Sequence, residues 1–334
     1  MKAIALVSGG LDSSLSAKLI KEQGINVVAL HFYLPFCFSQ QKVQHNHHNH
    51  SLRQRIESLG LEYREIKLGD DFLDIVRKPR YGYGANVNPC IDCKILMLTK
   101  SRELMGGWDA KFIITGEVLG QRPMSQHRRA LELIEKQSGL DGLILRPLSA
   151  QLLNATIPER EGWVDRKRLL NFSGRRRRPQ MELAGILDIQ DYPNPAGGCL
   201  LTDPEFSKKV RDLIEHAAFN LDNLELLKMG RHFRISKNSK LVVGRNEQEN
   251  IELFRLSQPG DYLFMPDDSL AGPTALGRGE FSPELIRLSC SITSRYCDLN
   301  GSGIANIIFR AFPEKDKVIE VSPIQEGELG SFRI

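Results

Sequence analysis

Short apolar runs alternate with amphipathic segments along roughly the first 120 residues. Residues 3–7 are continuously apolar, and apolar positions then recur at helical spacing until Gly24. The whole pattern predicts strands over residues 3–7, 25–32, 62–68, 111–115 and 142–145, and helices over residues 13–23, 52–59 and 95–105. Strands that alternate with helices predict an α/β fold with a doubly wound, mostly parallel sheet, whose ligands bind at the carboxyl ends of its strands.

The pattern changes after Pro204. One helix is predicted over residues 206–218, and short strands follow over residues 232–235, 240–243, 262–265, 304–312 and 317–321. This succession is typical of a smaller α+β domain. We expect a first domain over residues 1–205, a linker helix region over residues 206–224 and a second domain over residues 225–334.

Composition adds the cellular context. A chain of 334 residues with 41% hydrophobic and 26% charged residues is ordinary for a globular protein, and two cores fit this length. No apolar run approaches the roughly 18 residues of a membrane span. The first residues lead straight into a strand without a separate charged region and cleavage site, so we expect no signal peptide and a cytoplasmic location.

The net charge of +4 is too weak to indicate a nucleic-acid partner by itself, but its distribution is uneven. Eight basic residues lie close together, against the three acids Glu159, Glu161 and Asp165. The basic residues are Arg160, Arg166, Lys167, Arg168, Arg175, Arg176, Arg177 and Arg178. Such a cluster can bind phosphates, and a solvated loop is the alternative.

The turn after the first predicted strand has the composition of a polyphosphate site. Its residues are Ser8, Gly9, Gly10, Leu11, Asp12, Ser13 and Ser14. Glycines let a ligand approach the backbone, and hydroxyl groups and helix-start amides supply donors for phosphate oxygens. Asp12 would repel phosphates unless Mg2+ or a reacting group lies between them, so we interpret it as a functional residue.

Three of the six cysteines lie in informative surroundings. Cys90 and Cys93 form a C-x-x-C pair just before a predicted helix, where the helix start and Lys94 would lower the thiol pKa values. Cys199 follows a loop rich in proline and glycine. The three could bind an iron–sulfur cluster with one open iron, form a persulfide with a resolving thiol, or hold zinc, to which His127 could add a ligand. Buried, inert thiols are the plain alternative.

Two further groups are assigned by composition alone. Cys37, Cys290 and Cys297 have no motif around them, and we expect them to pack in cores. The segment from His45 to His50 could bind a transition metal in vitro, but its polar flanks favour a solvated insertion.

The 8–14 loop resembles the S-G-G-x-D-S signature of PP-loop ATP pyrophosphatases, and other segments resemble the branch of that family that forms thiouridine in tRNA. Residues 88–94, N-P-C-I-D-C-K, are similar to the P-C-x-x-C-K segment of 4-thiouridine synthetases. Residues 114–126 are similar to their T-G-E-x-L-G-Q-x-x-S-Q segment, and residues 143–148 to their I-L-R-P-L strand. The resemblance covers residues 1 to about 205. Residues 228–250 resemble the NFACT-R domain of RNA-associated proteins, and we expect no THUMP domain like that of 4-thiouridine synthetases.

The resemblance implies an ATP-dependent tRNA sulfurtransferase, which adenylates a uridine carbonyl oxygen and then inserts sulfur, releasing AMP and pyrophosphate. ATP and Mg2+ would bind Ser8, Gly9, Gly10, Asp12, Ser13 and Ser14, with His31, Gly116 and Gln121 near the nucleotide. Cys90, Cys93 and Cys199 would handle sulfur and hold a four-iron four-sulfur cluster, with zinc or no metal as alternatives. Arg175, Arg176, Arg177, Arg178, Arg231 and Arg234 would contact RNA.

The expected partners are tRNA and a sulfur donor of unknown identity, without a membrane, and the chain could form a homodimer. Two other functions stay open at this point. A PP-loop enzyme that uses ammonia would share the ATP chemistry and hold zinc on its cysteines. An RNA-binding protein with a degenerate nucleotide domain would catalyse nothing, although the intact 8–14 loop argues against it.

Overall fold

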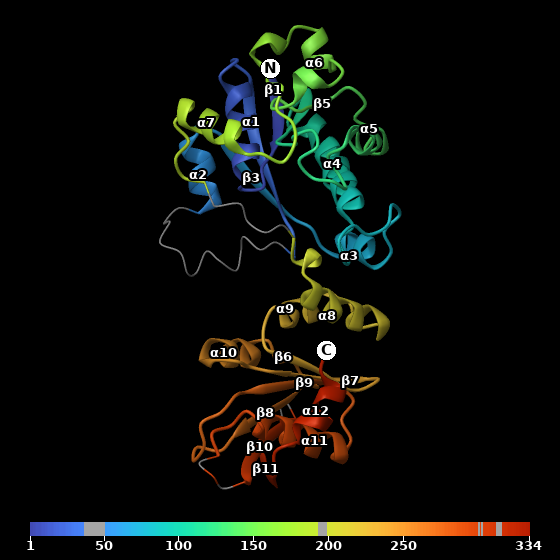
Figure 1. Cartoon of the computed structure of the whole chain (residues 1–334), viewed down its shortest axis with the longest axis vertical. Coiled ribbons are helices and arrows are strands. Elements are labelled where there is room, and N and C mark those ends of the chain that lie inside the picture. The colour runs from blue at the N-terminus through green and yellow to red at the C-terminus, as the bar shows by residue number, and fades with distance from the viewer. Residues whose placement is uncertain (37–50, 193–198, 300, 302, 312–315) are drawn as a thin grey trace. The chain divides into compact units, whose positions relative to one another are not determined.

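The computed structural model describes residues 1–36, 51–192, 199–299, 301, 303–311 and 316–334 (Figure 1). Cys37, the His45 to His50 segment and the loop before Cys199 lie outside these residues. The chain divides into two compact units, Met1–Asp203 and Pro204–Ile334, which are described separately. No helix in the described ranges combines the length and the apolar character that a membrane span needs.

The first unit is built on a five-stranded parallel sheet with the order β3-β2-β1-β4-β5. Its strands are β1 Lys2–Leu6, β2 Asn26–Tyr33, β3 Glu62–Lys67, β4 Phe112–Thr115 and β5 Ile144–Leu145. The central strand β1 pairs with β2 on one side and β4 on the other, and its interior residues Ala3, Ile4 and Ala5 are buried. A strand buried on both faces is continuously apolar, as the sequence predicted. The predicted parallel α/β fold is confirmed.

Helices cover both faces of this sheet (Figure 1). They are α1 Leu11–Lys21, α2 Leu52–Ser58, α3 Asp70–Arg77, α4 Cys90–Gly107, α5 Arg128–Gln137, α6 Ile157–Arg160 and α7 Arg178–Ile186, with short 3-10 turns at Ala150–Leu152, Arg166–Arg168 and Leu200–Thr202. Helices α1, α2 and α7 lie on one side of the sheet, and α4 and α5 on the other (Figure 1). On the first side, Leu15 of α1 and Ala184 of α7 share one apolar cluster.

The second unit contains a six-stranded sheet with the order β11-β10-β8-β9-β7-β6, in which every pairing is antiparallel. Its elements are α8 Pro204–Glu215, α9 Leu221–Leu227, β6 Arg231–Ser236, β7 Ser239–Val243, α10 Glu247–Arg255, β8 Tyr262–Pro266, β9 Ala275–Gly279, α11 Pro283–Ser294, β10 Ala305–Ala311, β11 Lys317–Val321 and α12 Glu326–Phe332. The expected smaller α+β domain is therefore present. Helix α8 falls within this unit.

Alternation along the strands builds two cores in the second unit. In β7, Leu241 and Val243 pack into a cluster with residues of α11 and α12, whereas Val242 packs with Leu253 of α10. Because successive side chains of a strand point to opposite faces, this one strand contributes to both clusters. Both faces of the sheet are thereby covered by helices.

Candidate active site

The 8–14 loop connects the carboxyl end of β1 to the first turn of α1. Gly9 has a φ of +80°, a conformation that glycine adopts without steric cost. The Ser8 amide donates to the Ser13 hydroxyl at 3.2 Å, and that hydroxyl donates to the Gly10 carbonyl at 2.8 Å. The loop is therefore held in shape by its own hydrogen bonds.

Gly10 is the N-cap of α1, and no side chain caps the first amides of this helix. A Cβ on Gly10 would meet only the Ser8 hydroxyl, at an ordinary 3.5 Å, and the φ of Gly10 is −85°. Nothing in the described packing therefore requires glycine at this position. A ligand that approaches the backbone and the helix N-terminus would require it, so the loop fits the phosphates of ATP.

Asp12 and Gln121 form the contact on which the candidate site is centred. The Gln121 side-chain amide donates to Asp12 Oδ2 at 3.0 Å, although 109 positions separate the two residues in sequence. Asp12 Oδ1 is buried and has no hydrogen-bond partner. A buried carboxylate oxygen without a partner is costly unless a cation or donor completes it, so Asp12 fits the expected Mg2+.

Two other predicted residues lie against the loop or beside it. A Cβ on Gly116, which follows β4, would lie 2.5 Å from the Ser13 amide nitrogen, so only glycine allows the backbones to approach this closely. His31 is buried at the end of β2, and its Nδ1 lies 2.9 Å from the carbonyl oxygen of Val7, next to the loop. The structure thus brings His31, Gly116 and Gln121 to the same end of the sheet as the loop.

The C-x-x-C pair lies at the start of α4. The Cys90 thiol donates to the Ser125 hydroxyl at 3.2 Å, and Cys93 follows one turn later on the same helix. Between them, the Asp92 carboxylate accepts hydrogen bonds from the backbone amides of Arg80 and Tyr81, at 2.9 and 3.1 Å. Asp92 therefore holds the preceding loop against the helix that carries both thiols.

Cys199 lies on a neighbouring segment. Its thiol is 3.6 Å from the Phe36 carbonyl oxygen. Two residues on, the Leu201 carbonyl accepts a hydrogen bond from the Val87 amide at 3.2 Å, just ahead of Cys90. The chain therefore brings the two cysteine segments side by side. Across the described ranges, no three His, Cys, Asp or Glu side chains are placed to hold a single metal ion, and the expected cluster stays a prediction.

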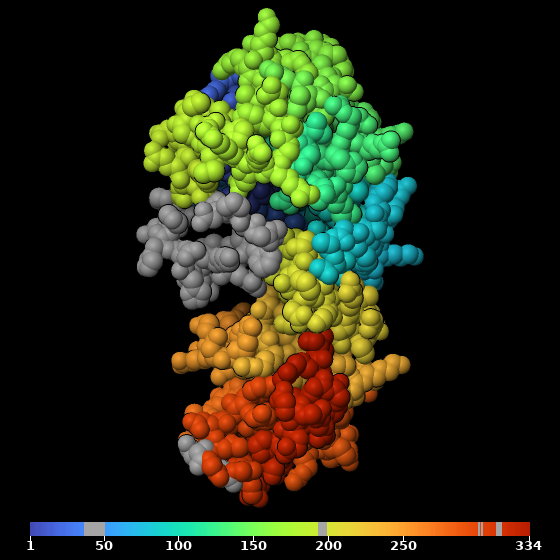
Figure 2. Space-filling model, viewed as in Figure 1, coloured from blue at the N-terminus to red at the C-terminus, as the bar shows by residue number. Residues whose placement is uncertain are grey.

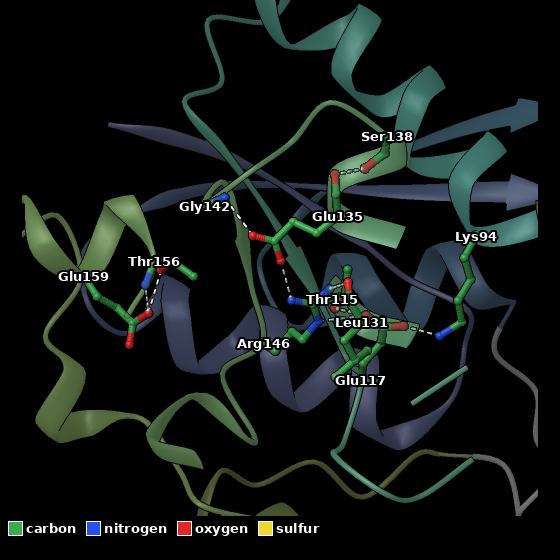
Figure 3. Close-up of polar contacts among 10 residues, drawn as sticks. All are labelled: Lys94, Thr115, Glu117, Leu131, Glu135, Ser138, Gly142, Arg146, Thr156 and Glu159. Carbon is green, nitrogen blue, oxygen red and sulfur yellow. Dashed lines mark hydrogen bonds and ion pairs between the residues drawn. The ribbon is translucent and has the colours of Figure 1, made fainter. Parts of the chain in front are cut away.

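Lys94, which follows Cys93 in the chain, belongs to a buried ion cluster that the sequence analysis did not assign (Figure 3). The Glu117 carboxylate pairs with the Lys94 ammonium and accepts from Arg146 Nε at 3.0 Å. Arg146, only 5% exposed, also pairs with Glu135 at 2.9 Å. Burial would raise the pKa of Glu117, but the charges of Lys94 and Arg146 outweigh burial and lower it to about 2.

A signal for this cluster was present in the sequence. Lys94, Glu117 and Arg146 each belong to one of the three segments on which the thiouridine-enzyme resemblance rests. The structure joins these segments through charge pairs. Lys94 was expected to act on the thiols, but its ammonium is instead paired with Glu117. The ion pairs of Lys94, Glu117 and Arg146 therefore hold the three sequence segments together.

The basic segment of the first unit begins next to the site. Ser173 bridges to Leu119, and the Gly174 amide donates to the Leu119 carbonyl at 2.7 Å, two residues from Gln121. Arg175, Arg176 and Arg178 then follow as exposed residues, and Arg177 is half-buried. Figure 2 shows the chain around residues 150–190, in green to yellow-green, across the visible surface of this unit.

Other basic residues are used inside the units. Arg166 pairs with Glu159, and Arg168 donates to the Glu22 carbonyl at 3.1 Å. In the second unit, the Arg234 guanidinium donates two hydrogen bonds to Asp212 of α8, at 2.8 and 2.7 Å. Arg234 therefore fastens α8 to the sheet, and we do not retain it as an expected RNA contact.

Arg231 differs from Arg234. Its guanidinium lies over the Tyr296 ring, 4.5 Å from the centroid, and donates to the Gly244 carbonyl at 3.1 Å. Arg333 donates to the hydroxyl of the same tyrosine at 3.3 Å. Arg231 is thus engaged with Tyr296 and Gly244, and its expected contact with RNA stays a prediction.

The structure has a parallel α/β sheet, with an S-G-G-x-D-S turn at the end of its first strand and a carboxylate in that turn. This is the arrangement that the resemblance to PP-loop nucleotide domains implies. Comparison with known families agrees: residues 1–152 match the family described as thiamine biosynthesis protein (ThiI). Residues 230–333 match the NFACT protein RNA binding domain. The predicted relationships of both parts of the chain are thereby confirmed.

Curated relatives share the first part of the chain. A protein of Thermococcus kodakarensis named "Probable tRNA sulfurtransferase" is 25% identical over 156 residues, which are 44% of this chain and 36% of that protein. A Helicobacter acinonychis protein named tRNA-specific 2-thiouridylase MnmA is 35% identical over 100 residues, which are 29% of this chain and 28% of that protein. The chain thus spans about a third of the relatives it matches.

Among solved structures, a 4-thiouridine synthetase–RNA complex with bound ATP is similar at 19% identity and a TM-score of 0.36. The match covers 68% of this chain and 52% of that one.

Proposed function

We propose that the chain is an ATP-dependent tRNA sulfurtransferase that thiolates a uridine. The uridine carbonyl oxygen attacks the α-phosphorus of ATP at the 8–14 loop, and pyrophosphate leaves. A sulfur nucleophile then attacks the ring carbon, the carbon–oxygen bond breaks, and AMP leaves with that oxygen. The names of the curated relatives, a tRNA sulfurtransferase and a 2-thiouridylase, support this reaction class.

One observation carries the proposal: a single short segment links the phosphate loop to the thiol helix. Gln121 contacts Asp12 of the loop at 3.0 Å, and Ser125, four residues later, contacts Cys90 of α4 at 3.2 Å. A group activated at the loop would therefore form close to the thiols. Proximity of this kind is what a two-step reaction on one base requires.

The loop residues would carry the first step. The uncapped amides at the start of α1 would bind phosphate oxygens, and Gln121 would hold the Asp12 carboxylate in place. Asp12 Oδ1 would ligate Mg2+, which supplies charge stabilisation to the departing pyrophosphate. Gly116 keeps β4 tight against the loop, so the donors stay oriented.

The thiols would carry the second step. Cys90 and Cys93 lie three positions apart, so both can act from one side of α4. In this route a persulfide sulfur donor transfers its outer sulfur to one thiol, and that sulfur attacks the activated carbon. The second thiol then attacks the protein sulfur atom of the new disulfide, which releases the thiocarbonyl and leaves a protein disulfide that a thiol reductant resets. Cys199 is the alternative second thiol, and this route needs no iron–sulfur cluster.

The substrate would be tRNA. Arg175, Arg176 and Arg178 are exposed and follow directly on the contact with Leu119, so they can bind phosphates near the site. The match of residues 230–333 to an RNA-binding domain supports a second contact. Because a base inside a helix cannot reach the thiols, the target uridine must unstack.

Full-length protein incubated with tRNA, Mg-ATP and a persulfide donor tests the proposal. The expected result is release of pyrophosphate and a thionucleoside in the digested tRNA, detected by mass spectrometry. An aminated nucleoside formed from ammonia would support the amidating alternative, and the absence of tRNA-dependent pyrophosphate release would support a non-catalytic RNA-binding protein. Iron and sulfide analysis of anaerobically purified protein separates the cluster from the persulfide route.

A further inference from the structure

We propose that Arg55 of α2 is a phosphate-binding residue, and that the hollow beside it receives the terminal phosphoryl group of ATP and, after cleavage, one end of the pyrophosphate. This inference rests on the proposed function. Arg55 belongs to no segment on which the resemblance to PP-loop enzymes rests. Its assignment comes from the position of its side chain against the 8–14 loop.

Helix α2 is fixed where it can present this side chain. Ser51 caps it, since the Gln54 amide donates to the Ser51 hydroxyl at 3.3 Å and Gln54 Oε1 accepts from the Ser51 amide at 2.7 Å. Ile56 is fully buried in the core of the first unit. Arg55, the residue before it, then reaches the loop: its Nη2 lies 3.6 Å from the place that a Cβ on Gly9 would occupy.

The hydrogen bonding of the Arg55 guanidinium is not satisfied by the described residues of the chain. Its Nε is buried and has no hydrogen-bond partner, and within the described ranges no carboxylate forms an ion pair with it. An arginine carries five N–H donors, and leaving one of them buried and unbonded is unfavourable. Arg53 on the same helix is different, because it is exposed, lies over the Tyr63 ring and is 3.9 Å from Glu57.

A hollow of about 60 Å³ lies between the Arg55 side chain and the loop. Gly9 and Ser14 line it together with Asp188 and Asp191. Its volume is about that of two water molecules in the liquid, which suits a phosphoryl group rather than a nucleoside. Arg55 is the positively charged residue among those that line it.

The two aspartates specify the form of the ligand. Asp188 and Asp191 add negative charge to the hollow, so bare phosphate would be repelled, whereas a magnesium complex of pyrophosphate carries less negative charge and still offers its oxygens to the guanidinium. The site therefore distinguishes ligands with β and γ phosphates from AMP. Binding should require Mg2+ for ATP and for pyrophosphate alike.

Calorimetric titration of the full chain with Mg-ATP, Mg-pyrophosphate and AMP tests the inference. In Arg55→Gln, affinity for Mg-ATP and Mg-pyrophosphate should fall about tenfold or more, because one charge-assisted hydrogen bond is lost, and affinity for AMP should stay within about twofold. Arg53→Gln, the matched control on the same helix, should leave all three affinities unchanged.

Several outcomes would overturn the inference. One is an Arg55→Gln protein that binds Mg-ATP and Mg-pyrophosphate as the wild type does, and another is an equal loss for AMP. If Arg55→Gln does not fold, Arg55→Met keeps an unbranched stem without charge or N–H donors, and unchanged affinity for both phosphate ligands in that variant would also overturn the inference. A wild-type chain that binds no Mg-ATP would instead refute the proposed function.

Discussion

The side-chain amide of Gln121 lies 3.0 Å from Asp12 Oδ2 and leaves Oδ1 of the same carboxylate buried without a partner. This contact fixes the orientation of Asp12, the one acidic residue of the 8–14 loop, whose other groups are suited to binding anions. It also explains why a glutamine 109 positions downstream belongs to the candidate nucleotide site. The predictions that follow begin from this pair.

Asp12→Ala is expected to reduce tRNA-dependent pyrophosphate release on the order of 100-fold, because the variant loses the metal ligand and the charge it positions. Gln121→Leu should have a smaller effect, about tenfold, since the carboxylate remains but is no longer oriented. Asp74→Ala, an exposed aspartate of α3 paired with Arg77, is the control and should leave the rate unchanged. Equal rates for Asp12→Ala and wild type would exclude the assigned role.

Cys90→Ala and Cys93→Ala should separate the two steps of the reaction. Both variants are expected to release pyrophosphate from ATP in the presence of tRNA but to form no thionucleoside, because only the sulfur transfer needs the thiols. Cys290→Ala is the matched control: burial raises the pKa of that thiol to about 12, and it should keep both reactions. Thionucleoside formation at the wild-type rate in Cys90→Ala would rule out this thiol as the nucleophile.

Glu117→Gln should destabilise the first unit by about 3–5 kcal/mol, because it leaves the Lys94 ammonium and the buried Arg146 guanidinium without their shared carboxylate. Both tryptophans of the chain, Trp108 and Trp163, lie in this unit, so urea unfolding followed by fluorescence reports on it. Glu57→Gln, an exposed residue of α2, serves as the comparison. Adding Lys94→Met to Glu117→Gln should recover part of the loss.

The same carboxylate gives the first unit an acid-sensitive stability. The folded-state pKa of Glu117 is lowered from 4.5 to about 2, so its contribution is complete above pH 4.5 and is lost as the pH falls towards 2. Fluorescence-detected urea midpoints should therefore fall more steeply from pH 5 to pH 3 in wild type than in Glu117→Gln. Parallel pH profiles for the two proteins would contradict the assigned ion pairs.

The second unit should respond in the alkaline range. Burial lowers the pKa of Lys240 to about 8, and Asp212, at 2.9 Å, offsets burial only in part. Because the folded state then binds fewer protons than the unfolded state between pH 8 and the ordinary lysine value of 10.5, Lys240 adds stability as the pH rises through this window. Hydrogen exchange of β6 and β7 amides, compared between wild type and Lys240→Met, should show the rise in wild type alone.

The order of elements in the first unit was determined locally. Residues 3–7 are apolar throughout, glycines follow at once, and Leu11 and Leu15 recur one turn apart on α1, so strand, loop and helix could be placed from neighbouring residues alone. Helix α3 was not predicted from the sequence, because its eight residues make only about two turns and the helical spacing of apolar residues is repeated too few times to be recognised. Strand β9 was missed because Gly277 and Gly279 weaken its pattern.

The contacts of the candidate site were decided by tertiary structure. The sequence does not indicate that the Glu117 carboxylate pairs with both Lys94 and Arg146. These residues lie at the carboxyl ends of β4 and β5 and at the start of α4, which come together only when the parallel sheet forms. Arg55 is one basic residue among several until α2 packs against the 8–14 loop. The chain specifies its chemistry through short-range motifs, whereas burial, pairing and the positions of unpaired donors depend on residues far apart in sequence.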